Sequence, residues 1–251
     1  NWAVLPEMFS VIKKDVGCKV VLWEGNLQFW RWFQSEALPY YDYVFVNDSY
    51  AIPLLRGPAG HPQVIHAPFN ICDPNVHKAP FLSEEQSAHY TSDLGFIGVG
   101  HPERRSFFEN FTDYDLKLWG IFWDKSSTLK PFFVPQKVEM QEKLAIYSSA
   151  RINVNIQAAK YQVNGISAKI FEIASCGGFF LTDRKKDLYL FFDKNDADMV
   201  SYRSINELKD KIDYFLSHEK ERWELAERMR RVTVERHTYE NRLTEMLSVL
   251  E

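Results

Sequence analysis

The chain has 251 residues, of which 45 % are hydrophobic and 25 % are charged. This composition is that of a globular protein with a sizeable core, not of a disordered or fibrous chain. The length exceeds that of a usual single domain but is too short for two full doubly wound domains. A formal net charge of −4 argues against nucleic acid as the main ligand, because proteins that bind its backbone usually carry a basic excess.

The sequence has no membrane-spanning or secretory pattern. No run approaches the roughly 18 consecutive apolar residues that a membrane span needs, and the first residues do not form a signal peptide. Three cysteines, Cys18, Cys72 and Cys176, are odd in number and far apart. They fit neither a disulfide framework nor a CxxC metal site. We therefore expect a reducing, cytoplasmic location.

The first part of the chain alternates between helical and β-type patterns. Apolar residues at helical spacing predict a helix over 2–16, and a second helical stretch lies near 27–38. Aromatic and β-branched runs predict strands at 19–23, 41–46 and 63–66. This alternation is typical of a parallel sheet with helices on its faces.

The apolar rhythm stops between residues 67 and 91, where prolines stand among polar residues, and we place a domain boundary there. The alternation then resumes with a predicted strand and helix repeated several times. The predicted strands are Asp93–Ile97, Leu116–Trp119, Arg151–Ile156 and Gly178–Thr182, with a short run at Met199–Tyr202. The predicted helices lie near 103–111, 137–149 and 167–175, and the tail from Ile205 is helical. The sequence thus predicts two α/β units, of which the second is the more complete.

A candidate phosphate site follows the first strand of the second unit. This strand ends at Gly98 and Gly100 and leads into a helix with Arg104 and Arg105 near its start. Glycines let the backbone approach a phosphate, the helix start presents free N–H groups, and arginine binds phosphate oxygens bidentately. A plain strand-to-helix turn with surface arginines is an equal alternative. The dinucleotide motif GxGxxG is excluded, because Glu103 stands where it needs glycine.

A second candidate begins at the polar loop Asn164-Gly165, which opens a helix that carries Lys169 and Glu172 one turn apart. The helix stops at the glycine pair 177–178, and a strand follows. Ligands of α/β sheets bind at strand carboxyl ends and helix starts, so an anion is expected at this loop. Glu172 would then accept hydrogen bonds from adjacent sugar hydroxyls. A Lys169–Glu172 pair on a solvated helix face is the alternative.

The segment Lys169–Asp183 (KIFEIASCGGFFLTD), together with His237–Arg242 (HTYENR), resembles the carboxyl-terminal domain of the CgeB-like (spore maturation protein) glycosyltransferases. These enzymes have the GT-B architecture. A weaker resemblance extends over 93–105, 43–48 and 67–77. The order of helix, glycine pair, strand and Thr-Asp end makes the first segment the most specific.

The resemblance implies two Rossmann-like domains with parallel sheets. We expect an acceptor-side domain over 1–85, a nucleotide-sugar-binding domain over 86–236, and a last helix over 237–251 that crosses back to the first domain. Only three strands remain for the first domain, where a Rossmann-like domain usually has about six. We therefore expect this domain to be truncated and the chain to be a piece of a longer protein.

The resemblance also implies transfer of a sugar from a nucleotide-sugar donor, bound mainly by the second domain, to a saccharide, protein or lipid-linked acceptor. Glu172 matches the second Glu of a Glu-x7-Glu motif, which binds ribose hydroxyls. Asn164 replaces the first Glu and carries no charge. Lys169 takes the place of a basic residue that faces the donor diphosphate, with Arg104 or Arg105 assisting. Side chains and helix dipoles neutralise the diphosphate in GT-B enzymes, so no metal or other cofactor is expected.

Two further parts of the site are expected from this scheme. The nucleotide base would bind after Trp119 and in the 121–138 loop. An inverting reaction needs a general base, and the candidates are Glu24, Asp48 and His66 at predicted strand ends. A carboxylate at a strand end is more often a cap of the next helix.

Two other functions fit the same scaffold. The first is a nucleotide-sugar epimerase or hydrolase, which product analysis with and without acceptor separates from a transferase. The second is a non-catalytic glycosyltransferase-like module that binds a nucleotide or a partner. Asn164 in place of a glutamate and the short first domain favour this second alternative.

Overall fold

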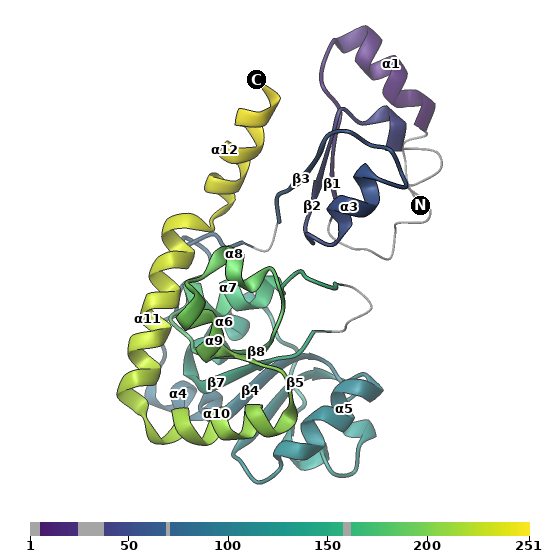
Figure 1. Cartoon of the computed structure of the whole chain (residues 1–251). Helices are drawn as coiled ribbons and strands as arrows, with labels where there is room; N and C mark the ends of the chain where they lie inside the picture. Colours follow the sequence, from purple (N-terminus) through teal and green to yellow (C-terminus); the bar gives the residue numbers. More distant parts are fainter. Residues whose placement is uncertain (1–5, 25–37, 69–70, 158–161) are drawn as a thin grey trace.

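The computed structural model describes residues 6–24, 38–68, 71–157 and 162–251 and contains two parallel sheets (Figure 1). The first sheet has the strand order β1-β2-β3. Its strands are β1 (Val21–Glu24), β2 (Tyr43–Val46) and β3 (Val64–His66). Helix α1 (Pro6–Val16), a 3-10 turn (Leu38–Tyr40) and α3 (Ala51–Arg56) accompany them.

The second sheet is larger, with the strand order β6-β5-β4-β7-β8-β9. Its strands are β4 (Ser92–Val99), β5 (Leu116–Ile121), β6 (Phe133–Val134), β7 (Ala150–Asn155), β8 (Phe180–Asp183) and β9 (Ser201–Tyr202). The helices are α4 (Glu84–Tyr90), α5 (Pro102–Phe108), α6 (Met140–Ser149), α7 (Ala168–Ser175), α8 (Leu188–Phe191), α9 (Lys194–Val200), α10 (Ile205–Ser217), α11 (Glu219–Arg236) and α12 (Tyr239–Leu250). Short 3-10 turns lie at Glu109–Phe111, Trp123–Lys125 and Lys130–Phe132. All registered strand pairs are parallel, as the alternating pattern predicts.

Helix α4 and three short helices were not predicted from the sequence. Helix α4 lies inside the stretch 67–91, where we expected irregular chain. It begins with a capping box in which Ser83 and Gln86 satisfy each other's backbone N–H groups, a signature that depends on two polar residues and not on apolar spacing. The helices α3, α8 and α9 were missed because they have only four to seven residues, too few to show a helical apolar period. The helix expected near 27–38 lies almost wholly outside the described residues.

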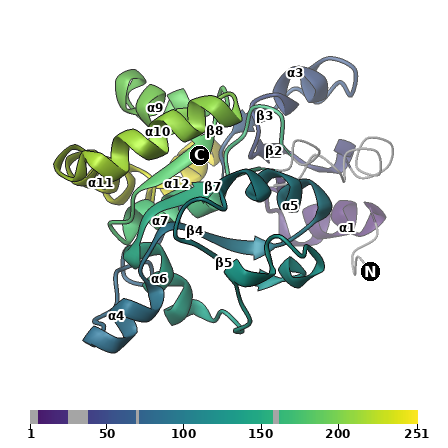
Figure 2. The same cartoon turned by 90° about the horizontal axis from the view of Figure 1, so that it is seen from below.

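Strand alternation explains how both faces of the second sheet are buried. Leu118 on β5 belongs to the large core cluster, whereas its neighbour Trp119 belongs to a smaller cluster with Tyr90 and Ile146. Successive side chains of a strand point to opposite faces, and helices cover both faces of a parallel sheet. Figure 2 shows α4 and α6 on one side of the second sheet and α9 and α10 on the other.

The carboxyl-terminal helix α12 reaches the first sheet (Figure 1). Met246 on this helix is buried against Phe45 and Ala67 of the first sheet. Just before α12, the chain pairs with the segment between the sheets, because Cys72 and Thr238 form a parallel bridge. The domain limits 1–85, 86–236 and 237–251 stay predictions.

Candidate functional site

The turn between β4 and α5 depends on closely packed glycines. Gly120 on β5 has φ +120, and a Cβ there would lie 2.3 Å from the carbonyl oxygen of Gly98, so no other residue fits. The indole of Trp123 donates to the same carbonyl at 2.9 Å. A Cβ on Gly100 would lie 2.9 Å from the Trp123 ring. The glycines therefore bring two strand ends together, and at Gly98 a Cβ would lie 2.9 Å from the Phe96 ring and 3.2 Å from Lys169 Nζ.

Two cations from different helices meet at this turn. Lys169 on α7 donates from Nζ to the carbonyl of Ile97 at 2.7 Å, and Nζ lies 4.7 Å from the ring centroid of Phe96. Arg104 on α5 donates to the carbonyl of Val99 at 3.2 Å. Its guanidinium carbon lies 5.3 Å from the same Phe96 ring. We call Lys169, Arg104 and Phe96 the cation site.

The electrostatics of the cation site favour an anion. Burial and the positive charge of Arg104 together lower the pKa of Lys169 to about 8, although the nearby carboxylate of Glu172 opposes the shift. A negatively charged ligand beside both cations would reverse this effect and raise the pKa of the amine. The cation site thus places two positive charges beside a turn that contains two glycines.

Arg105 is held differently from its neighbour Arg104. Its Nη1 donates to the carbonyl of Gly100 and, at 3.5 Å, to that of Phe122. Phe122 is in the left-handed conformation, with φ 67. Arg105 therefore bonds the backbone of the turn, and of the two predicted arginines only Arg104 shares the Phe96 ring with Lys169.

Glu172 does not pair with Lys169, so the solvated-face alternative is wrong. Its Oε1 accepts from Lys143 Nζ at 3.0 Å and lies 3.8 Å from Nε2 of the buried His77. His77 Nδ1 accepts from the backbone N–H of Asp73 at 3.0 Å, which assigns the proton of a neutral ring to Nε2, toward Glu172. The sequence did not indicate Lys143 or His77 as neighbours of Glu172, because Lys143 lies on α6 and His77 in the segment before α4, both far from Glu172 along the chain.

The loop Asn164-Gly165 contacts the first sheet. Asp48, just after β2, accepts on Oδ2 from the N–H of Val163 at 2.6 Å and from that of Asn164 at 3.2 Å. The side-chain amide of Asn164 donates to Ser49 Oγ at 3.0 Å. A Cβ on Gly165 would lie 3.3 Å from Asp48 Cβ. Asn164 and Gly165 thus join the two sheets, which corrects the expectation that they lie open to a donor anion.

Asp187 also belongs to this contact between the two sheets. We call the group of side chains that form it the junction; it consists of Asp48, Ser49, His66, Asn164 and Asp187. The carboxylate of Asp187 is 1 % exposed and accepts from the N–H of Ser49 at 2.9 Å and from the Ser49 hydroxyl. His66 Nε2 lies 3.4 Å from Asp187 Oδ2. Burial acts to raise the pKa of Asp187, but His66 and Ser49 outweigh it and lower that pKa. The sequence did not indicate Asp187 as a site residue, because this residue follows the basic run 184–186, which is typical of a solvated surface.

The junction separates the three candidates for a general base. Asp48 accepts from the N–H of Tyr50 as well as from two N–H groups of the 163–164 loop, so its carboxylate is engaged in positioning backbone. Glu24 ends β1 next to residues outside the described part of the chain. His66 is partly exposed and has a buried carboxylate as its neighbour. This arrangement is the one that orients an imidazole for proton transfer.

Trp119 is a core residue, which corrects its assignment to the nucleotide-base pocket. Its side chain is 0 % exposed and makes an edge contact with His89, at 5.5 Å between ring centroids. Trp123 is equally buried. In the 121–138 loop, Phe122 has an accessible ring, 46 % exposed. An aromatic residue at the end of a strand buried on both faces packs against helices before it can meet a ligand.

Three properties bear on cofactors and location. Within the described ranges, no three His, Cys, Asp or Glu side chains are grouped to hold a metal ion. The same ranges contain no helix with the length and apolar character of a membrane span. Cys18, Cys72 and Cys176 are free thiols, the last two buried.

Comparison with known proteins agrees with the two-sheet architecture. The sequence model of the glycosyl transferase-like family matches residues 104–248. A search of curated proteins gives no significant match. A glycosyltransferase from Rickettsia africae has a TM-score of 0.66 and 10 % identity, covering 98 % of this chain and 79 % of that one.

Two further solved structures are similar. HepE from Anabaena, in complex with UDP and glucose, has a TM-score of 0.69 and 12 % identity, covering 98 % of this chain and 76 % of that one. A sucrose-phosphate synthase from Thermosynechococcus elongatus has a TM-score of 0.61 and 13 % identity, covering 97 % and 76 %. At these identities the likeness shows the fold alone. The fold is GT-B, with Rossmann-like units and parallel sheets, as the sequence predicts.

Proposed function

Because the chain belongs to the glycosyl transferase-like family, we propose that it transfers a sugar from a nucleotide-sugar donor to a saccharide, protein or lipid-linked acceptor. The observation that carries this proposal is the cation site, where Lys169 and Arg104 converge on one ring beside Gly98. The donor diphosphate would bind there, on the second unit. Side chains then neutralise the leaving diphosphate, and no metal ion takes part.

The two cations suit a diphosphate better than a single anion. Arg104 presents a planar fork that binds two oxygens, and Lys169 supplies a compact charge. Both lie at the carboxyl end of β4, the edge at which α/β sheets bind ligands. The developing negative charge of the leaving group would be stabilised by cations already in place, which lowers the barrier to transfer.

Glu172 is the proposed ribose contact. Its Oε1 is bound by Lys143, which fixes the direction of the carboxylate, and Oε2 can accept from the ribose hydroxyls. UDP is the first nucleotide to test, since Anabaena HepE is similar in fold and was solved with UDP-glucose. The narrower CgeB-like assignment and a cytoplasmic location stay predictions.

For an inverting transfer, His66 is the proposed general base. A proton on Nε2 would face Asp187, 3.4 Å away, which leaves the lone pair of Nδ1 for the acceptor hydroxyl. The acceptor oxygen forms a bond to the anomeric carbon, the bond from that carbon to the diphosphate oxygen breaks, and the acceptor proton passes to Nδ1. Asp187 stabilises the imidazolium that results.

Thermal shift with nucleotides tests donor binding. UDP and UDP-glucose should raise the melting temperature, because a ligand at 100 times its Kd adds about 2.7 kcal/mol. Lys169→Met should lose this shift, whereas Lys194→Met, at a lysine on α9 whose side chain is 79 % exposed, should keep it. If UDP, GDP, dTDP and their sugars all leave the melting temperature unchanged, the proposed donor site is wrong.

One observation favours a non-catalytic binding module as the second candidate. Asn164 stands where related enzymes carry a glutamate, and it is used in the junction: its amide bonds Ser49 and its carbonyl accepts from Asp187 N–H. A module would bind the nucleotide through the cation site without turnover. Release of nucleoside diphosphate from any donor, followed with and without acceptor, excludes the module and separates transfer from hydrolysis or epimerisation.

A further inference from the structure

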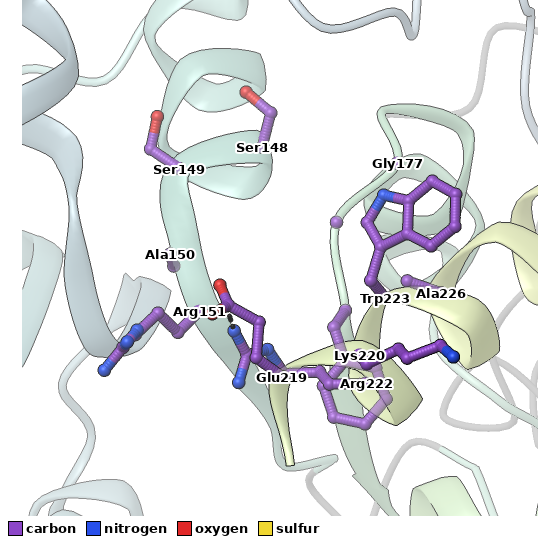
Figure 3. A pocket seen from close by; sticks show the side chains of 12 residues that line it. Ser148, Ser149, Ala150, Arg151, Gly177, Glu219, Lys220, Arg222, Trp223 and Ala226 are labelled. Atoms are coloured by element: carbon purple, nitrogen blue, oxygen red, sulfur yellow. Dashed lines mark hydrogen bonds and ion pairs between the residues drawn. The ribbon is translucent and has the colours of Figure 1, made fainter. Parts of the chain in front are cut away.

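The second unit has a pocket at the edge of the sheet opposite the cation site. It lies where β7 begins and just before β8, between the end of α6 and the first turns of α11 (Figure 3). The pocket is open to solvent and has a volume of about 770 Å³. The donor site proposed above uses carboxyl ends of strands, so this pocket is separate from it.

An exposed tryptophan stands in this pocket. Trp223 on α11 is 66 % exposed, whereas Trp119 and Trp123 are completely buried. Tryptophan buries a large apolar surface when it has a partner, so an accessible indole in a pocket marks a contact surface. Figure 3 shows its ring near Gly177 and Ala226, which also line the pocket.

Two of the residues that line the pocket are the glycines Gly177 and Gly178. Gly177 has φ +76, and a Cβ on Gly178 would lie 2.3 Å from the carbonyl oxygen of Tyr147. Both positions therefore require glycine. Gly177 and Gly178 therefore line the pocket with Trp223 and add no side chains to it.

The charged side chains at the pocket are matched in pairs. The pairs are Arg151 with Asp93 at 3.1 Å, Arg222 with Glu219 at 3.4 Å and Lys220 with Glu224 at 3.9 Å. Arg222, whose side chain is 9 % exposed, also donates to the carbonyl of Phe215. Three cations thus stand beside three carboxylates, so the surface of the pocket has no excess of positive charge. Such a surface suits an uncharged polar ligand better than a nucleotide or another anion.

We propose that this pocket binds an uncharged saccharide chain. One face of a pyranose ring is made of C–H groups and packs on an aromatic ring, while its hydroxyls both donate and accept. Trp223 supplies the ring, and the exposed side chains of Glu219 and Lys220 supply an acceptor and a donor beside it. An open pocket accepts part of a long chain whose other residues extend into solvent. The inference concerns binding outside the donor site and does not depend on turnover.

Calorimetric titration of the full chain with cellohexaose, maltohexaose and chitohexaose tests the proposal. At least one of them should bind with a Kd below about 10 mM. Trp223→Ala should weaken that binding about tenfold or more, and Trp223→Phe should weaken it less, because a smaller ring keeps part of the stacking. Phe81→Ala removes another exposed ring, 99 % accessible, and should leave the affinity unchanged.

Two results would overturn the proposal. One is the absence of binding by all three hexasaccharides, and the other is equal affinity in the wild type and Trp223→Ala. UDP is titrated as an anionic ligand for comparison, and its affinity should be the same in the wild type and in Trp223→Ala. A loss of UDP binding in Trp223→Ala would show that the pocket binds the nucleotide instead. Failure of UDP to bind either protein counts against the donor site and leaves the saccharide result to stand by itself.

Discussion

The cation site and the junction both gather polar side chains from distant parts of the chain, but they differ in how those groups are satisfied. In the junction, the carboxylates accept from backbone and side-chain donors, and Asp187 has a lowered pKa. In the cation site, Lys169 lies near the like charge of Arg104 and has a pKa of about 8. The first arrangement stabilises the folded chain, whereas the second costs stability that an anionic ligand recovers.

The largest expected effect is on stability, at the junction. Asp187→Ala removes the acceptor of the Ser49 N–H and hydroxyl and the partner of His66. Two hydrogen bonds to a buried charged acceptor are worth about 3 kcal/mol together. Chemical denaturation should show this loss in the free energy of unfolding. Asp213→Ala, at an exposed carboxylate on α10, should cost less than about 1 kcal/mol, and equal losses would contradict the account.

The second effect is on binding, at the cation site. Lys169→Met removes a donor to the proposed diphosphate, so UDP affinity should fall about 10- to 100-fold, the range for a hydrogen bond to a charged group. The free energy of unfolding should stay the same or increase, because a partly buried charge beside Arg104 is removed. Calorimetry and denaturation measure the two quantities. A variant that loses stability and keeps its affinity would make Lys169 a structural residue.

Arg104 and Arg105 sharpen the comparison because they are neighbours with different contacts. Arg104→Gln should weaken UDP binding about tenfold. Arg105→Gln should instead lower the free energy of unfolding by about 1 kcal/mol, since its guanidinium bonds the carbonyl of Gly100. Both variants are measured by calorimetry and by denaturation. The reverse pattern would exchange the roles of the two arginines.

The smallest expected effect is a pH dependence of stability. Lys169 has a pKa of about 8 in the folded chain and an ordinary value of 10.5. Between these values the unfolded chain holds more protons, so this group makes the free energy of unfolding rise with pH. Relative to Lys169→Met, the wild type should gain about 1 kcal/mol between about pH 8 and 9. A constant difference between the two proteins would show that the pKa is ordinary.

The strands and long helices of the second unit could be predicted because their apolar periods are local. The glycine turn and Lys169 were also accessible to sequence reasoning, because each lies at a predicted strand end or helix start. The partners of Asn164 were not, since Ser49 and Asp187 come from other elements and no local pattern brings them together. Trp119 was misassigned because a strand buried on both faces looks the same at its end as within it.

The central claim is that Lys169 and Arg104 bind the diphosphate of the donor. It is tested most directly by calorimetric titration of UDP at about pH 8.5 in two buffers with different ionisation enthalpies, which gives the protons taken up on binding. Since Lys169 has a pKa of about 8 in the free chain, binding should take up roughly half a proton or more, and Lys169→Met should take up none. Binding without proton uptake, or equal uptake in both proteins, would contradict the claim.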